Sequence, residues 1–136
     1  MFLLVPVFVL VLVAAAPGKK PKTFKAKTIV EVEEYTPRTP GTAQTFTAEG
    51  GVSASRPACR VGRRVEVHQI NGIVDTVVAV TTTVKQPGNP AEGGWSATWT
   101  TPPNGFSFFV EVSPRKIPKK HTLCKIGSSP PVTFPG

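Results

Sequence analysis

The sequence has few of the side chains on which catalysis and metal binding usually depend. Its 136 residues include two cysteines, two histidines and eight acidic residues, of which Asp75 is the only aspartate. A hydrolase would need a nucleophile with a base and an orienting group, or a pair of carboxylates. His68 falls within an alternating stretch and His121 in a basic loop, and neither belongs to a nucleophile-elbow or metal-binding motif. We therefore expect no catalytic residue, no metal site and no cofactor.

The sequence also lacks the patterns of long helices. Fifteen prolines and twelve glycines interrupt it, and leucine is nearly confined to the first dozen residues. Valine and threonine are abundant instead, and β-branched residues fit a pleated, half-buried surface. Short alternating stretches separated by turn signals then predict an all-β fold. We expect an Ig-like, two-sheet antiparallel β-sandwich of about seven strands.

The only long hydrophobic run lies at the start of the chain, over residues 2–13, and small residues follow it. A run of this length is typical of a secretory signal peptide and is shorter than the roughly 20 residues of a membrane-spanning helix. No basic residue precedes the run and Pro6 interrupts it, so an uncleaved anchor is the alternative. The predicted organisation is a signal peptide over residues 1–15, a basic linker over 16–22 and the β-sandwich domain over 23–136. Cleavage would leave no stable membrane span, and we expect the protein to be secreted, with association with the cell envelope as the more specific form of this expectation.

Alternation of apolar and polar residues locates the strands of the predicted domain. The clearest examples are residues 23–35, 45–55, 64–69, 95–100 and 106–112, followed by a last strand around 122–126 and an edge strand through Val132 and Phe134. The Gly50-Gly51 pair within one strand suggests a bulge or a close backbone approach. Asn71-Gly72 predicts a type I′ hairpin turn, with a returning strand over residues 73–85.

The two cysteines, Cys59 and Cys124, are expected to form an intramolecular disulfide, as is usual in an exported chain. Closing a loop of this length stabilises a fold by about 4 kcal/mol on the chain-entropy model. A metal-binding or redox role for the pair is the weaker alternative, because the sequence has no CxxC spacing.

Several motifs resemble a domain of secreted bacterial proteins. They are Phe46-Thr47-Ala48-Glu49-Gly50, Val52-Ser53, Arg64-Val65-Glu66-Val67, Gly93-Gly94-Trp95-Ser96, Asn104-Gly105-Phe106-Ser107-Phe108-Phe109-Val110, and the two cysteines with Ser128-Ser129. This pattern is similar to the carboxypeptidase-regulatory-like group of Ig-like sandwiches and covers residues 23–134. The resemblance implies an accessory, display or carbohydrate-associated module without catalytic residues. The chain departs from the pattern in a Pro-rich insertion over residues 86–92.

Trp95 and Trp99 share one face of a predicted strand, and two interpretations follow. Core burial is favoured, because alternation places both on the face that also carries apolar neighbours, and each would bury a large aromatic area. The alternative is an aromatic platform for a sugar ring.

Basic residues give the chain a formal net charge of +8 and suit it to polyanions. Two basic groups flank the cysteines, so a disulfide would bring them together as one candidate polyanion-binding patch. The members of this patch are Arg60, Arg63, Arg64, Arg115, Lys116, Lys119, Lys120 and Lys125. The competing interpretation is a solvated surface whose charge aids solubility. No recognition motif predicts sequence-specific nucleic-acid binding.

These observations favour a secreted, non-catalytic β-sandwich module for binding or display at the cell envelope. Its expected partner is an anionic envelope polymer or polysaccharide, and the sequence does not determine the oligomeric state. Two hypotheses of other classes remain open. One is a carbohydrate-binding domain that uses Trp95, Trp99 or the loop over residues 86–94, and the other is a small secreted enzyme of unrecognised type.

Overall fold

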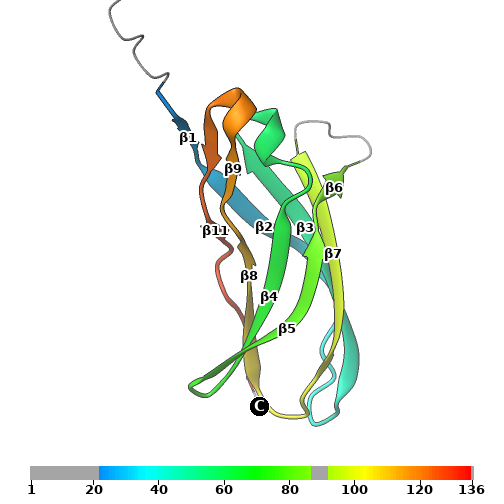
Figure 1. Cartoon of the computed structure of the whole chain (residues 1–136). Coiled ribbons are helices and arrows are strands. Elements are labelled where there is room, and N and C mark those ends of the chain that lie inside the picture. Colours follow the sequence, from blue (N-terminus) through cyan, green and yellow to red (C-terminus); the bar gives the residue numbers. More distant parts are fainter. Residues whose placement is uncertain (1–21, 87–91, 136) are drawn as a thin grey trace, which may run out of the picture.

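The described part of the chain is a β-rich molecule (Figure 1). The computed structural model describes residues 22–86 and 92–135, which form twelve strands in three mostly antiparallel sheets and two short 3₁₀ turns. The all-β prediction is confirmed, although several strands are only two or three residues long and the count exceeds the expected seven. The predicted signal peptide and residues 87–91 of the Pro-rich insertion lie outside the described residues. No helix within the described ranges is long and apolar enough to cross a membrane.

A four-stranded antiparallel sheet is built from β2 (Thr28–Tyr35), β3 (Gln44–Ala54), β7 (Glu92–Thr101) and β6 (Val84–Lys85), in that order. The close approach expected at Gly50 is confirmed. A Cβ atom built on Gly50 would lie 1.9 Å from the carbonyl oxygen of Glu31 on the neighbouring strand. Only a residue without a side chain leaves room for this contact.

A five-stranded sheet is built from β11 (Gly127–Ser128), β8 (Phe106–Val112), β4 (Arg64–Asn71) and β5 (Val74–Thr82), with β12 (Val132–Phe134) also paired to β8. The predicted edge strand at the end of the chain is therefore confirmed. The hairpin between β4 and β5 is present, but its turn differs from the type I′ prediction. Asn71 pairs with Val74, so Gly72 and Ile73 are the central residues, and only Gly72 has a positive φ, of 62°. Glycine at the first central position is the pattern of a type II′ turn.

These two sheets share one hydrophobic core. Its aromatic centre is Phe46, whose ring centroid lies 5.1 Å from that of Trp99 and 5.8 Å from that of Phe108. Valine and alanine side chains from both sheets fill the rest of the core. The alternation predicted for these strands is confirmed at its inward positions, namely Phe46, Ala48, Val52, Val65, Val67, Trp95, Ala97, Trp99, Phe106, Phe108, Val110 and Val112.

A small third sheet closes one end of the molecule, at the top of Figure 1. Its strands are β1 (Phe24–Ala26), β10 (Thr122–Cys124) and β9 (Arg115–Ile117), and β1 runs parallel to β10. The 3₁₀ turns η1 (Pro57–Cys59) and η2 (Pro118–Lys120) lie at the same end. His121 was predicted to lie in a basic loop, but the residues just before it form β9 and η2. The alternating signal is absent there because β9 has only three residues.

The single strand predicted over residues 73–85 is in fact divided between two sheets. β5 pairs with β4, whereas β6 pairs with β7 of the other sheet, and Thr83 lies at the crossing. Thr83 is buried, and its amide donates to the carbonyl oxygen of Arg63 while its hydroxyl accepts from the Arg63 amide, each at 2.9 Å. The division has no sequence signal because residues 76–84 are nearly all valine and threonine, with no glycine or proline at the crossing.

Candidate functional site

The predicted disulfide between Cys59 and Cys124 is present. The two Cα atoms are 5.4 Å apart, and both residues are completely buried. The bridge joins η1 to β10, and with Ala26 and Ala54 the two cysteines form a second, smaller core beneath the third sheet. The disulfide therefore fixes the end of the molecule to which the two basic groups belong.

Arg63 lies in the interior of this end rather than on its surface. Its side chain is 1% exposed. Its guanidinium donates to the carbonyl oxygens of Cys59 at 2.8 Å, Ser113 at 2.8 Å and Lys125 at 3.0 Å, and to the hydroxyl of Thr28 at 3.1 Å. These four acceptors come from separate segments, so one side chain connects η1, β2 and the chain on either side of the third sheet.

Burial lowers the pKa of Arg63 from its ordinary value, and the nearby charge of Arg115 lowers it further. An arginine so placed is held by neutral acceptors and its charge is kept from solvent. Arg63 was predicted to belong to the polyanion-binding patch, but its guanidinium is not accessible to a polymer. Its function here is structural.

The other seven residues of the predicted patch are at least partly accessible. Arg60 donates from Nε to the carbonyl oxygen of Ala54 at 2.8 Å, and Arg115 donates from Nη1 to that of Gly62 at 3.3 Å. The contact at Gly62 joins the two basic groups, as expected from the disulfide. The remaining members are exposed, namely Arg64, Lys116, Lys119, Lys120 and Lys125. Among the described residues, none of these cations forms an ion pair with a carboxylate.

A groove of about 640 Å³ lies on the third sheet. Across its strands Lys25 pairs with Leu123, which in turn pairs with Lys116, so an apolar side chain is flanked by two lysines. Pro118 and His121 of the turn also line the groove. We call this feature the basic groove. It combines two flexible lysine side chains with an apolar floor. This arrangement suits an anionic polymer, whose charged groups would contact the lysines while its carbon skeleton lies on the leucine.

Lys25 was not among the predicted site residues, although it belongs to the basic stretch near the start of the domain. The parallel pairing of β1 with β10 brings it beside Leu123, nearly a hundred residues later in the chain. No local sequence pattern predicts this pairing, because β1 has only three residues and so shows no clear alternation. The positive charge of residues 19–27 was the only sequence feature that could have indicated Lys25 as a site residue.

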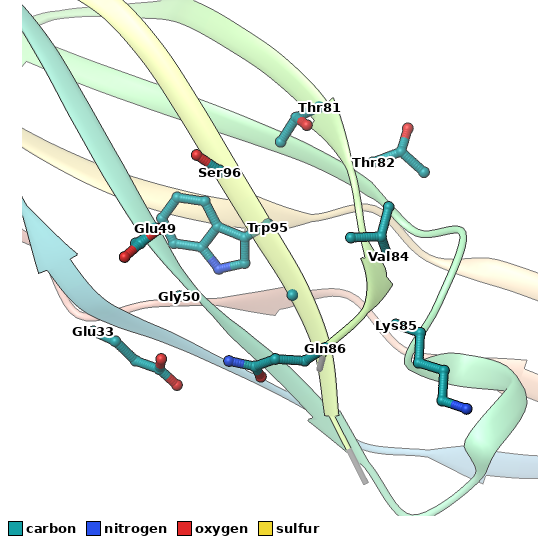
Figure 2. Close-up of a pocket in the computed structure, with 11 residues that line it drawn as sticks. Glu33, Glu49, Gly50, Thr81, Thr82, Val84, Lys85, Gln86, Trp95 and Ser96 are labelled. Atoms are coloured by element: carbon teal, nitrogen blue, oxygen red, sulfur yellow. The ribbon is translucent and has the colours of Figure 1, made fainter. Parts of the chain in front are cut away.

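A second hollow, of about 410 Å³, lies where β6 pairs with β7, and Gln86 is part of its lining (Figure 2). The indole of Trp95 borders it, with Glu33 and Glu49 on one side and Lys85 on the other. Hydroxyl groups of threonine and serine and the amide of Gln86 complete its rim.

Both tryptophans are core residues, as the favoured interpretation predicted. Trp95 is 3% exposed and Trp99 is 6% exposed. Each indole nitrogen has a partner within the protein: Trp95 donates to the carbonyl oxygen of Glu31 at 3.3 Å, and Trp99 to Oε1 of Gln69 at 3.1 Å. Neither ring presents an open face on which a sugar could stack.

Comparison of this chain with protein-family models, with curated proteins and with solved structures finds no match. The comparisons therefore identify no family, and the function must be inferred from the geometry.

Proposed function

We propose that this protein is a non-catalytic binding module whose disulfide-bonded end binds an anionic polymer of the cell envelope. The observation that carries the proposal is the basic groove. It places Lys25 and Lys116 on either side of Leu123 at the end of the molecule where the other exposed cations gather.

The electrostatics of this end support an anionic partner. The formal net charge of the chain is +8, and the exposed lysines and arginines here have no carboxylate partner among the described residues. Unpaired surface cations attract polyanions and raise the rate of encounter with them. Such cations are expected to remain hydrated and available in the free protein.

The rigidity of the same end also supports binding. The disulfide and the buried Arg63 hold the strands that carry the groove. A rigid surface loses little conformational entropy on binding, so most of the ordering cost falls on the long lysine side chains.

The experiment is retention of the full chain on immobilised heparin, a sulfated polysaccharide used as a polyanion probe, eluted with a salt gradient. The test variant is K25Q/K116Q. The matched control is K27Q/K85Q, which removes the same charge from exposed lysines outside the groove. We expect the test variant to elute at clearly lower salt than the control, because polyanion affinity depends on the number of cations that contact the polymer.

Equal elution of the two variants would show that net charge, and not the groove, determines retention. A wild-type protein that passes through at low salt would contradict polyanion binding altogether. Co-sedimentation with isolated cell envelopes across a salt series then connects the probe with the natural surface.

We further propose that the fold is an Ig-like sandwich from a secreted protein. The order β2-β3-β7-β6 in one sheet agrees with the ABED order of such domains. The order β11-β8-β4 in the other sheet agrees with their GFC order, and β5 takes the place of the strand that variable-type domains add beside C. The buried disulfide agrees with folding in an oxidising compartment. The carboxypeptidase-regulatory-like resemblance belongs to the same proposal and would imply an accessory role.

Carbohydrate binding is a second candidate, favoured by the hollow in Figure 2. Its rim of carboxylates, hydroxyls and one amide suits the hydroxyl groups of a sugar, with the edge of Trp95 beside them. A neutral oligosaccharide that changes tryptophan emission, with an effect removed by the Glu49→Gln and Gln86→Ala changes, would support this candidate. Emission unchanged by a panel of neutral oligosaccharides would exclude it.

A further inference from the structure

The outer face of the five-stranded sheet carries a cluster of metal-binding side chains. Glu66 and His68 alternate along β4 with buried valines, so both point away from the core. On the neighbouring strand β8, Glu111 lies directly across from Glu66, and Phe109 lies directly across from His68. One potential ligand atom from each of Glu66, His68 and Glu111 lies within 4.8 Å of the other two.

The two glutamates form an unfavourable pair in the absence of a cation. Like charges directly opposite each other on neighbouring strands destabilise a sheet. Both side chains are only partly exposed, and neither forms an ion pair with a lysine or arginine of the described residues. Arg64 shares the outward face of β4 with Glu66 but forms no ion pair with it.

Contacts with Asp75 and Phe109 fix the ring of His68, and one of its two ring nitrogens has no hydrogen-bond partner in the described structure. Its Nδ1 lies 2.9 Å from Oδ1 of Asp75, and its ring stacks on Phe109 with 4.7 Å between centroids and 13° between planes. Its Nε2 is buried and has no hydrogen-bond partner in the described structure. Leaving a buried polar atom without a partner is costly, and a bound ion or water molecule at Nε2 would remove that cost.

We propose that Glu66, His68 and Glu111 bind a divalent transition-metal ion, with Zn²⁺ as the representative species. Asp75 would accept a hydrogen bond from the Nδ1–H group, which keeps the proton on Nδ1 and leaves the lone pair of Nε2 for the metal. A carboxylate behind a ligating histidine is the usual support of such sites, because it fixes the tautomer and the ring orientation. Zinc–ligand bonds of about 2 Å require the flexible glutamates to close in slightly around Nε2.

The donor set determines the class of ion. An imidazole nitrogen favours zinc, copper, nickel or iron, whereas sites for magnesium and calcium are made of oxygen atoms. Three protein ligands leave a fourth position on the solvent side of the sheet, where water or an anionic group of a partner could bind. The site is separate from the basic groove, whose lining comes from β1, β9, β10 and η2.

No local motif indicates this site. Glu66 and His68 are two residues apart on one strand, but Glu111 joins them only through the pairing of β4 with β8. The support from Asp75 likewise comes across the β4–β5 hairpin. We expected no metal site because neither histidine belongs to a metal-binding motif. Here the three candidate ligands come together through strand pairing, which a linear motif does not record.

The test is calorimetric titration of the disulfide-bonded full chain with ZnCl₂ in a buffer that does not bind metal. We expect one ion per chain, with heat that Mg²⁺ and Ca²⁺ do not reproduce. The isosteric changes Glu66→Gln and Glu111→Gln should each weaken zinc binding at least 10-fold. Asp75→Asn should weaken it by 10-fold to 100-fold, the usual effect of losing the group that orients a ligating histidine.

The matched controls are Glu92→Gln, which removes a carboxylate elsewhere, and His121→Asn, which removes the other histidine. Asparagine tolerates the left-handed backbone found at position 121, where φ is 46°. A direct readout that needs no variant is the ¹⁵N NMR spectrum of the His68 ring, in which zinc should shift Nε2 far more than Nδ1.

Absence of zinc binding up to millimolar concentration would overturn the proposal, as would binding that Glu66→Gln and Glu111→Gln leave unchanged. Binding that depends on His121 would assign the metal to a different place. A zinc-induced shift at Nδ1 instead of Nε2 would contradict the function given to Asp75.

Discussion

Arg63 and Thr28 meet in the interior, with 3.1 Å between Nη1 of the arginine and Oγ1 of the threonine. The threonine hydroxyl in turn donates to the carbonyl oxygen of Lys125 at 2.6 Å, and Arg63 donates to that same oxygen at 3.0 Å. One carbonyl, one hydroxyl and one guanidinium thus form a closed triangle that connects β2, the residue just before β4 and the chain after β10. No carboxylate takes part.

Replacing Arg63 should destabilise the protein strongly. Arg63→Ala leaves the carbonyl oxygens of Cys59 and Ser113 without their guanidinium donor, and we expect unfolding free energy to fall by about 3 kcal/mol. Arg63→Lys should recover only part of this, because an ammonium group lacks the planar fork that reaches several acceptors. Urea denaturation gives both values. The control is Arg64→Ala, an exposed neighbour whose loss should matter little, and equal effects at the two positions would contradict the structural function of Arg63.

Removing the disulfide should lower stability by about 4 kcal/mol on the chain-entropy model, since the bridge closes a separation of 65 residues. The double change Cys59→Ser with Cys124→Ser, compared with the oxidised wild type by thermal melting, measures this. Reduction of the wild type should lower the melting temperature in the same direction. A melting temperature that neither treatment changes would show that Arg63 and the core alone hold this end together.

Gly50→Ala should be far more harmful than Gly94→Ala. A Cβ atom at position 50 would lie 1.9 Å from the carbonyl oxygen of Glu31, whereas one at position 94 would meet nothing nearer than 3.6 Å. The backbone must move to admit a methyl group at position 50. We expect Gly50→Ala to lower the unfolding free energy by about 3 kcal/mol, and Gly94→Ala to lower it by less than about 1 kcal/mol. Denaturation midpoints of the two variants test the contrast. A mild Gly50→Ala variant would mean that β2 can move away from β3 near Glu31 without loss of stability.

Glu49→Gln should stabilise the protein near neutral pH and lose that advantage in acid. Glu34 lies directly across from Glu49, and its hydrogen bond and its negative charge raise the pKa of Glu49. A raised carboxyl pKa means that the folded state binds the proton more tightly than the unfolded state does. Stability therefore falls as pH rises from the ordinary carboxyl pKa through the raised one. Melting curves of wild type and variant between pH 3 and pH 7 measure the difference, and a constant offset across that range would contradict the pairing.

The sequence predicted those strands whose alternation of apolar and polar residues can be recognised within the strand itself. β3, β7 and β8 each alternate between inward and outward residues, and that periodicity is visible without knowing what lies opposite. The close approach at Gly50 was visible for the same reason, because a glycine pair within a strand weakens it unless space is short. The edge strand through Val132 and Phe134 was also predicted, from two apolar residues spaced for one face.

The features that sequence did not predict all depend on distant partners. Arg63 was assigned to the surface because arginine is usually exposed, and its acceptors are main-chain carbonyls that carry no side-chain signature. The transfer of the chain between sheets at Thr83 depends on which strands have free edges. The cluster of Glu66, His68 and Glu111 depends on the register of β4 with β8, which a single strand does not encode.

The parallel pairing of β1 with β10 has a mechanical consequence. The chain enters the domain through β1 at the disulfide end, and β12 ends beside Phe106 at the opposite end (Figure 1). A pull between the two ends therefore acts along the strands, so the β1–β10 hydrogen bonds are loaded together in shear instead of opening one at a time. The covalent link from Cys124 to Cys59 carries that load onward to η1. The domain should therefore resist extension between its two ends more strongly than a domain whose terminal strand unzips.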